Sequence, residues 1–293
     1  MVLAEVYNWR RMHERMDHLR DLRLYEAERT LEYFPRSGRI LEIGAGSGWQ
    51  SKMFSDLGYD VSAIDVETSQ YLGQKVFPVE TYDGAKIPFS EKSFNVVFSS
   101  NVLEHITDVE RFQQEIARVL APGGFAVHVL PTASWRLWSD LTYYSALPGR
   151  AFRRLKRLSA FRRAASWADV EEETRPESTD LYEFGEFVAA GDIPYEPAPA
   201  LQQRMLRRLR LLRRLGAPTH GEKGNALSEI YYFSRYRWKP LFERAGFSVV
   251  GCHPNKLFYT GYSLFGDGLS ISARRRISSV LGSSCLIYVV KPV

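Results

Sequence analysis

The chain has 293 residues, of which 45% are hydrophobic and 25% charged, a composition that excludes a disordered chain and fits a sizeable core. A net charge of +5 is mild for this length. Because Cys252 and Cys285 are isolated and no Cys/His cluster has ligand spacing, we expect neither a disulfide framework nor a metal site. No secretory signal follows the N-terminus and no apolar run reaches the roughly 18 residues of a spanning helix, which favours a cytoplasmic location.

Short apolar runs follow a charged, helix-forming start of the chain. Pro35 and Gly38 end the helical pattern that precedes them. Within the run over 75–80, Pro78 favours an edge strand, because proline removes a hydrogen bond from a strand. The predicted elements are, in order, helices within 4–34, a strand over 39–43, a helix over 47–57, a strand over 60–65 and an edge strand over 75–80.

Strands and helices continue to alternate in the next part of the chain. Asp108 is a suitable N-cap for a helix, which Pro122 and the glycines after it end. The predicted elements are a strand over 93–99, a helix over 108–120, a strand over 125–130, a helix over 225–242 and strands over 247–252 and 284–290. This alternation indicates an α/β fold with a doubly wound, mostly parallel sheet.

Between residues 132 and 225 the regular pattern stops and charge separates into blocks. Lys and Arg gather over 150–163 and again over 204–214, and ten acids lie over 169–196. We divide the chain into an N-terminal helical cap (1–37), the first part of the core (38–131), a helical insertion that serves as a substrate lid (132–225) and the second part of the core (226–293).

Apolar residues recur at helical spacing over 201–215, with arginines on the other faces. Such a basic amphipathic helix can lie on an anionic membrane surface, so peripheral membrane contact is one interpretation. Packing on the core, with arginines paired to the acidic block, is another. Nucleic acid is the least favoured partner, because dense arginine without interleaved aromatics is poor evidence for base recognition.

A glycine-rich loop joins the first predicted strand to the helix that follows it. Gly44, Gly46 and Gly48 alternate with Ala45 and Ser47. Glycines let the backbone turn sharply and approach a ligand at the N-terminus of a helix. Asp65 ends the next strand, where a carboxylate can accept hydrogen bonds from both hydroxyls of a ribose. Loop and acid together predict a site for an adenosine-containing cofactor.

The spacing of the loop distinguishes between cofactors. Dinucleotide-binding loops favour G-x-G-x-x-G, whereas Gly44 to Gly48 reads G-x-G-x-G. Glu42 stands two residues before the first glycine, where an anion repels a pyrophosphate but suits a ligand with an ammonium and a sulfonium. This favours S-adenosylmethionine as the cofactor.

These motifs resemble the class I methyltransferases of the broad "methyltransferase type 11" group, over 38–131 well and over 226–293 loosely. The resemblance implies a seven-stranded Rossmann-like sheet whose last strand is antiparallel. It also implies that the glycine loop contacts the methionine part, that Asp65 with Val66 holds the ribose, and that Asp83 and Gly84 lie beside the adenine. Asn101 and the residues after it then line the floor of the pocket. A plain turn is an alternative role for Asp83.

The acceptor is less defined than the cofactor. No Asn/Asp-Pro-Pro-aromatic tetrapeptide follows the strand over 93–99, which disfavours methylation of nucleic-acid bases and favours small molecules. A hydroxyl acceptor must lose a proton, and His105 and His220 are the candidate bases, although each also has an ordinary structural interpretation. The leading hypothesis is O-methylation of a small or lipid-linked metabolite. An NAD(P)-dependent oxidoreductase and a non-catalytic Rossmann-like protein whose basic helices contact membrane or RNA are the alternatives.

Overall fold

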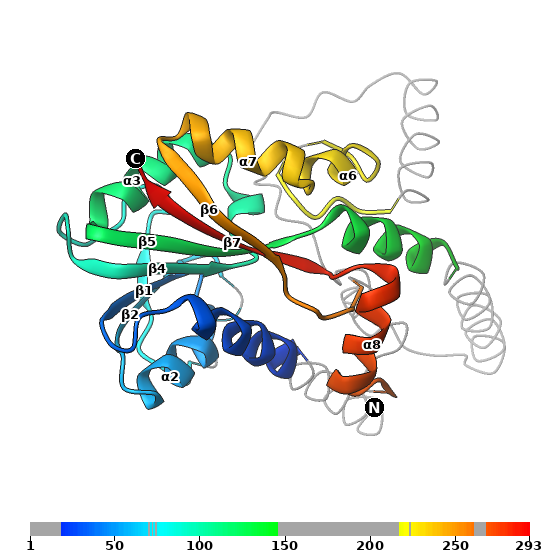
Figure 1. Cartoon of the computed structure of the whole chain (residues 1–293), viewed down its shortest axis with the longest axis horizontal. Helices are drawn as coiled ribbons and strands as arrows, with labels where there is room; N and C mark the ends of the chain where they lie inside the picture. Colours follow the sequence, from blue (N-terminus) through cyan, green and yellow to red (C-terminus); the bar gives the residue numbers. More distant parts are fainter. Residues whose placement is uncertain are drawn as a thin grey trace, which may run out of the picture.

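The computed structural model describes residues 19–69, 71, 73, 75–145, 217–222, 224–260 and 268–293. One seven-stranded sheet runs through this part of the chain, in the order β3-β2-β1-β4-β5-β7-β6 (Figure 1). The strands are β1 (Arg39–Ile43), β2 (Asp60–Val66), β3 (Glu80–Tyr82), β4 (Phe94–Ser100), β5 (Leu120–Pro131), β6 (Phe247–Pro254) and β7 (Cys285–Pro292).

The predicted fold class is confirmed. Strands β1 to β5 pair in parallel, and β7 is antiparallel to both of its neighbours, β5 and β6. The central strand β1 is buried along residues 40–43 because both faces of the sheet are covered. Its near-continuous apolar run is the sequence signal for that position.

Helices cover the two faces of the sheet (Figure 1). The helices α3 (Val109–Val119) and α7 (Arg235–Arg244) pack on one face, while α2 (Trp49–Asp56), α8 (Ile271–Leu281) and the helical residues 19–30 pack on the other. Alternate residues of one strand enter different cores: Leu41 faces α3, and Ile40 faces α2. The predicted cap of α3 is confirmed, since the Asp108 side chain accepts a hydrogen bond from the Arg111 amide at 3.1 Å.

Two predicted elements are wrong. The strand expected over 75–80 is a loop, and β3 begins only at Glu80, after the proline at position 78. The single helix expected over 225–242 is two helices, α6 (Ser228–Tyr232) and α7, separated by an extended Ser234. The break lets Phe233 enter one core while Trp238 enters the other.

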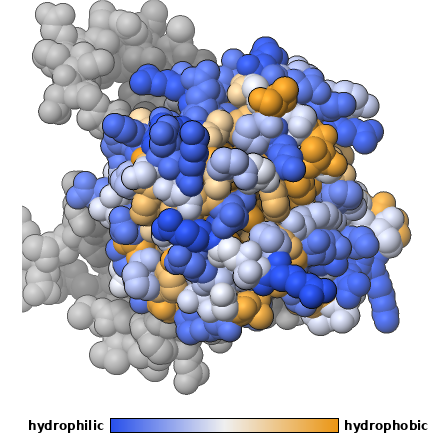
Figure 2. Space-filling model, turned by 60° about the vertical axis from the view of Figure 1, so that its left-hand side comes forward, coloured by the Kyte–Doolittle hydropathy of each residue, from blue (hydrophilic) through white to orange (hydrophobic). Residues whose placement is uncertain are grey.

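Most of the predicted insertion lies outside the described residues, including its basic and acidic blocks, as do residues 1–18 of the predicted cap. The described part of the insertion begins with a helix over 133–145. Among the described residues, no helix combines the length and apolar character that crossing a bilayer requires. One face of the molecule is mainly hydrophilic, with smaller hydrophobic patches between the polar side chains (Figure 2).

Phe98 tests the packing that holds the N-terminal segment to the sheet. Its fully buried ring lies 5.2 Å from the ring of Phe54 and 6.1 Å from that of Phe34. We expect Phe98→Ala to lower the free energy of unfolding by about 3–5 kcal/mol, because it leaves a cavity between three elements. Urea denaturation measures this loss. The control Leu227→Ala removes a side chain that is 78% exposed and should change stability by less than about 0.5 kcal/mol. Equal effects of the two substitutions would contradict this packing.

Candidate functional site

The glycine loop turns the chain sharply between β1 and α2. Gly44, Gly46 and Gly48 have φ values of +71°, +56° and +83°, which place all three in the left-handed region that favours glycine. The amides of Gly44 and Ala45 both donate to the Ile64 carbonyl, at 2.8 and 3.1 Å. The loop is therefore fixed over the end of β2, and Gly48 is the N-cap of α2.

Asp65 faces this loop from the end of β2. The Gly46 amide donates to Asp65 Oδ2 at 2.7 Å, and the Ser69 hydroxyl donates to the same oxygen at 3.1 Å. The Val66 amide donates to Oδ1 at 2.7 Å. A carboxylate oxygen can accept two hydrogen bonds, so Oδ1 can still accept a ribose hydroxyl. The position and chemistry of Asp65 fit the nucleoside of the cofactor.

Side chains from neighbouring segments pack against the glycines. A Cβ atom at Gly44 would overlap Val102, and one at Gly48 would come within 2.7 Å of Phe77 Cβ. At Gly46 the nearest atom is Tyr71 Cβ, at 3.3 Å. Neighbouring protein side chains thus occupy much of the space next to the glycines. A larger residue at position 44 or 48 would not fit.

Glu42 is buried beneath the loop, with 1% of its surface exposed. The Ser51 hydroxyl donates to its carboxyl group. Burial raises the pKa of Glu42 to about 8, to which the neighbouring charge of Asp65 contributes. The attraction to a ligand ammonium or sulfonium that the sequence predicts requires an ionised Glu42. In the folded protein this carboxyl is mostly protonated at pH 7. A cation beside it would lower its pKa and restore the negative charge of the carboxylate.

Asp83 forms a local turn after β3. Its Oδ1 accepts hydrogen bonds from the amides of Ala85 and Lys86, both at 2.8 Å, and these bonds lower the pKa of Asp83. Gly84 has a φ of +77°, and a Cβ atom there would lie 3.2 Å from Val66. The structure thus brings Val66, Asp83 and Gly84 together at the carboxyl ends of β2 and β3, and uses the Asp83 carboxylate as a turn former.

Asn101 lies where β4 ends, in the left-handed region with a φ of +56°. Its amide donates to the Val129 carbonyl at 2.8 Å, so it is anchored to β5. The next residue, Val102, is the side chain that contacts Gly44. Asn101 therefore lies beside the glycine loop, at the same edge of the sheet as Asp65.

Glu104, His105 and His220 form a cluster near the end of β4. Glu104 and His105 belong to a 3-10 turn, Leu103–His105. His220 lies near the C-terminal end of the predicted insertion. The ring centroids of the two histidines are 4.9 Å apart, and the His220 ring lies 4.7 Å from Trp135. Burial lowers the pKa of His220 to about 3, so its imidazole is neutral at pH 7. Desolvation and the charges of His220 and Arg23 also lower the pKa of His105, although its side chain is 43% exposed.

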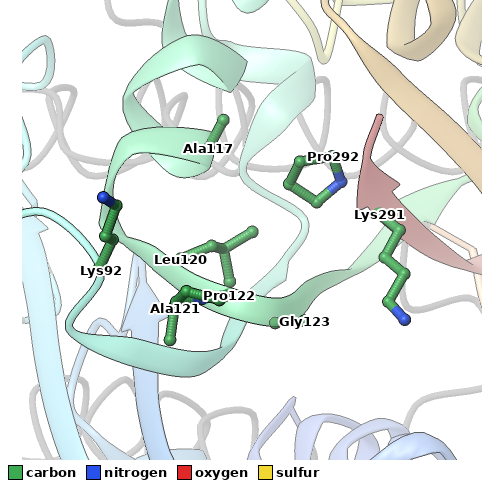
Figure 3. A pocket seen from close by; sticks show the side chains of 9 residues that line it. Lys92, Ala117, Leu120, Ala121, Pro122, Gly123, Lys291 and Pro292 are labelled. Carbon is green, nitrogen blue, oxygen red and sulfur yellow. The ribbon is translucent and has the colours of Figure 1, made fainter.

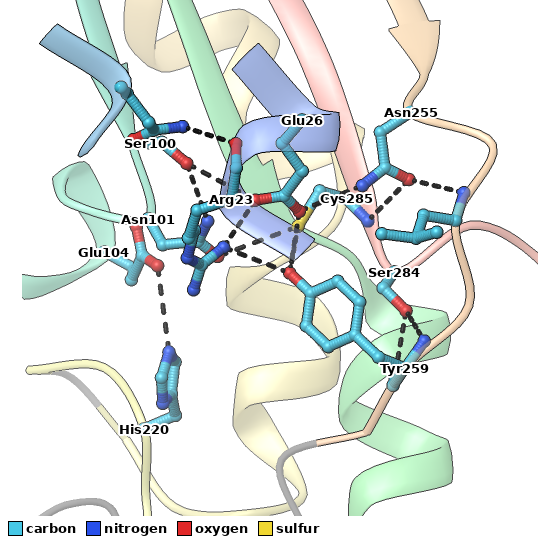
Figure 4. Close-up of polar contacts among 12 residues, drawn as sticks. Arg23, Glu26, Ser100, Asn101, Glu104, His220, Asn255, Tyr259, Ser284 and Cys285 are labelled. Carbon is cyan, nitrogen blue, oxygen red and sulfur yellow. Dashed lines mark hydrogen bonds and ion pairs between the residues drawn. The ribbon is translucent and has the colours of Figure 1, made fainter. Parts of the chain in front are cut away.

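A buried polar network lies beside this cluster (Figure 4). The sequence does not predict it. Glu26 is fully buried and accepts hydrogen bonds from the Tyr259 hydroxyl at 2.9 Å and from Asn255 at 3.0 Å. Arg23 pairs with Glu26 at 2.5 Å. Cys285 lies 3.0 Å from the Tyr259 hydroxyl. The network joins residues 19–30 to the ends of β6 and β7, and only the tertiary structure brings its members together.

Two cavities lie away from the glycine loop. One of about 210 Å³ is at the opposite end of the sheet and contains none of the predicted site residues (Figure 3). Its lining includes Lys92, Pro122 and Lys291. A second cavity of about 40 Å³ lies beside the histidine cluster, lined in part by Glu104 and Gly221. Of the cluster, only Glu104 lines the second cavity.

The sheet order, the glycine loop and the acid at the end of β2 define a class I S-adenosylmethionine-dependent methyltransferase. The family described as "Methyltransferase domain" matches residues 9–251, and the chain belongs to this family. The oxidoreductase and the non-catalytic binding protein are accordingly not favoured.

Curated relatives match about a third of this chain. An uncharacterized methyltransferase from Mycobacterium sp. (strain JLS) is 31% identical over 100 residues, which cover 33% of this chain and 40% of the relative. A demethylmenaquinone methyltransferase from Renibacterium salmoninarum is 31% identical over 90 residues, covering 29% and 38%. The match thus spans about two fifths of each curated relative. The crystal structure of an S-adenosylmethionine-dependent methyltransferase from Mesorhizobium loti covers 89% of this chain and 94% of its own, with 14% identity and a TM-score of 0.45.

Asp65→Ala tests the contact between β2 and the glycine loop. Loss of a charged acceptor for ribose hydroxyls should weaken S-adenosylhomocysteine binding roughly ten- to hundredfold, measured by calorimetry. Asp60→Ala is the matched control, because Asp60 begins the same strand and pairs only at the surface with Arg39, at 3.1 Å. An Asp65→Ala protein that stays folded and binds as tightly as the control would remove Asp65 from the cofactor site.

The raised pKa of Glu42 predicts that cofactor binding depends on pH. An ammonium beside Glu42 needs the ionised carboxylate, and protonation dominates below a pKa of about 8. Affinity for S-adenosylhomocysteine should therefore rise as pH rises and level off above about 8, with a slope of up to about tenfold per pH unit. Calorimetry across this range measures the slope. Glu42→Gln cannot ionise and should bind with a flatter profile; an unchanged profile would show that another group titrates.

Proposed function

We propose that this methyltransferase transfers a methyl group to a hydroxyl oxygen of a small or lipid-linked acceptor. The observation that carries the proposal is the position of the cluster of Glu104, His105 and His220. Two of its members, Glu104 and His105, belong to the turn that follows Val102, and Val102 contacts the glycine loop at Gly44. An acceptor at the cluster would therefore be close to the methionine part of the cofactor.

The cofactor supplies an electrophilic methyl group on a sulfonium, a good leaving group. The chain must then hold the acceptor in line and keep water away, so positioning contributes most of the rate. A hydroxyl must also lose its proton for its oxygen to become an effective nucleophile. We assign His105 and His220 to this activation, because the two rings lie side by side at the acceptor end of the site.

The cofactor-binding roles rest on the geometry of the loop and the strand ends. In this proposal Asp65 accepts hydrogen bonds from the ribose through its Oδ1, and Glu42 lies toward the ammonium. Ser69 and Tyr71 lie over the contact between Asp65 and Gly46, so they shift when the nucleoside enters. The remaining proposed contacts are Gly44, Ala45, Gly46 and Gly48 for the methionine part, Val66 for the ribose, Asp83 and Gly84 for the adenine, and Asn101 for the pocket floor.

A lipid-linked acceptor is one form of this proposal. The relative from Renibacterium salmoninarum is named for demethylmenaquinone. The basic stripes that favour peripheral contact with an anionic membrane, within 150–163 and 201–215, lie outside the described residues. Their sequence pattern supports the proposed membrane contact. The proposed chemistry at His105 and His220 is the same for a lipid-linked acceptor as for a small one.

Transfer of an isotope-labelled methyl group tests the function. The protein is incubated with labelled S-adenosylmethionine and matched sets of phenolic, alcoholic and amine acceptors, and the labelled product is identified by mass spectrometry. We expect label on oxygen. His220→Ala should lower kcat by about a hundredfold or more, with unchanged S-adenosylhomocysteine binding, because only acceptor activation is lost.

His253→Ala is the control for this substitution. His253 is an exposed residue of β6 whose ring stacks on Tyr33, and it should leave kcat within about twofold of the parent. Label found only on nitrogen, or equal kcat values for the two histidine variants, would contradict the proposed chemistry.

A further inference from the structure

The carboxylate of Glu104 is buried without a hydrogen-bond donor. Its side chain is 0% exposed, and within the described part of the chain neither oxygen has a hydrogen-bond partner. A buried carboxyl group without a partner is costly, and the cost is greatest for the ionised form. Such a group is stable when a cation or a donor occupies the space before it.

Two imidazole nitrogens lie near this carboxylate. His220 Nε2 lies 3.7 Å from Glu104 Oε1, and His105 Nε2 lies 4.0 Å from the same oxygen. These distances are too long for hydrogen bonds, so the histidines do not satisfy the carboxylate. One ligand atom from each residue lies within 4.8 Å of the other two. Figure 4 shows His220 and Glu104 pointing toward one another.

These separations are close to those of a metal centre. With bonds of about 2.0–2.1 Å, neighbouring ligands of a tetrahedral zinc ion are roughly 3.3 Å apart. The two distances to Glu104 need to shorten by less than an ångström. The His105 side chain is 43% exposed and has room to rotate toward the other two. A small cavity of about 40 Å³ borders Glu104 and Gly221.

The backbone holds His220 against Glu104. The amide of Glu222 donates to the Glu104 carbonyl at 3.1 Å. The amides of His220 and Gly221 donate to Glu229 Oε1, at 2.7 and 2.8 Å, and Arg136 pairs with the other oxygen of Glu229 at 3.1 Å. Two of the three side chains are thereby fixed relative to each other before any ligand binds.

We propose that Glu104, His105 and His220 bind a divalent transition-metal ion of the Zn²⁺ type. Two imidazoles and one carboxylate form a ligand set that such ions accept in catalytic sites. Three protein ligands leave a coordination position open. The spacing of His105 and His220 in the sequence hides the site, which explains why the sequence led us to expect no metal.

The open position gives the ion a role in acceptor activation, and this step rests on the proposed function. A Lewis acid beside a hydroxyl lowers the pKa of that hydroxyl. The hydroxyl O–H bond breaks and its proton passes to solvent. The oxygen then forms a bond to the methyl carbon, while the carbon–sulfur bond breaks and its electron pair stays on sulfur. His105 and His220 thus activate the acceptor as ligands.

Metal binding can be measured without turnover. The protein is stripped with a chelator, dialysed against Zn²⁺ and analysed for bound metal, and Co²⁺ is added to a second sample as a spectroscopic probe. We expect one Zn²⁺ per chain, a visible Co²⁺ spectrum, and a higher Tm with Zn²⁺, because binding to the folded state stabilises it. His220→Gln and Glu104→Gln should lose all three effects, whereas His253→Gln should keep them.

Each other outcome is decisive. Equal Zn²⁺ content in His220→Gln and His253→Gln would place any bound metal elsewhere and overturn the site. A folded parent protein that binds no Zn²⁺ or Co²⁺ would also overturn it. If the chelated protein methylates a hydroxyl at the full rate while His220→Ala is inactive, the metal proposal fails but the proposed function stands. Label on nitrogen alone, with Zn²⁺ bound at the cluster, would instead remove the proposed O-methylation and keep the metal site.

Discussion

The hydrogen bond from the Gly46 amide to Asp65 is the interaction on which the site depends. It joins the glycine loop after β1 to the end of β2 at 2.7 Å. The loop can present this amide only because three of its residues adopt left-handed φ values, a conformation that glycine reaches without a steric cost. The contact therefore links a requirement on the sequence to the placement of a carboxylate, and it sets where α2 and the nucleoside site begin.

The elements around the glycine loop can be predicted from the sequence because local interactions determine them. The apolar runs of β1 and β2, the glycines between them and the Asp108 cap of α3 act over a few residues, and each lies where the sequence predicts it. The errors arise where distant packing decides. The helix expected over 225–242 is interrupted because Phe233 and Trp238 enter different cores. Neither core can be read from the segment itself.

The acceptor side could be predicted only in part. His105 and His220 stand out as histidines, but the spacing along the chain does not bring them together. Glu104 gives no signal in the sequence, because its importance lies in burial and in the lack of a donor, which are properties of the folded chain. The network of Glu26, Tyr259 and Cys285 is of the same kind: its members belong to three separate segments.

Three of the buried carboxyl groups at the site differ in how many hydrogen-bond donors they have. Asp65 accepts hydrogen bonds from two amides and a hydroxyl, so its charge is compensated and it can serve neutral ribose hydroxyls. Glu42 has the hydroxyl of Ser51, and burial raises its pKa, so a ligand ammonium would supply what is missing. Glu104 has no donor among the described residues. Since an uncompensated buried charge is costly, the group with the fewest donors has the greatest need for a cation. The donor count thus matches the ligands that we propose for the three acids: a polar neutral group at Asp65, an organic cation at Glu42 and a metal ion at Glu104.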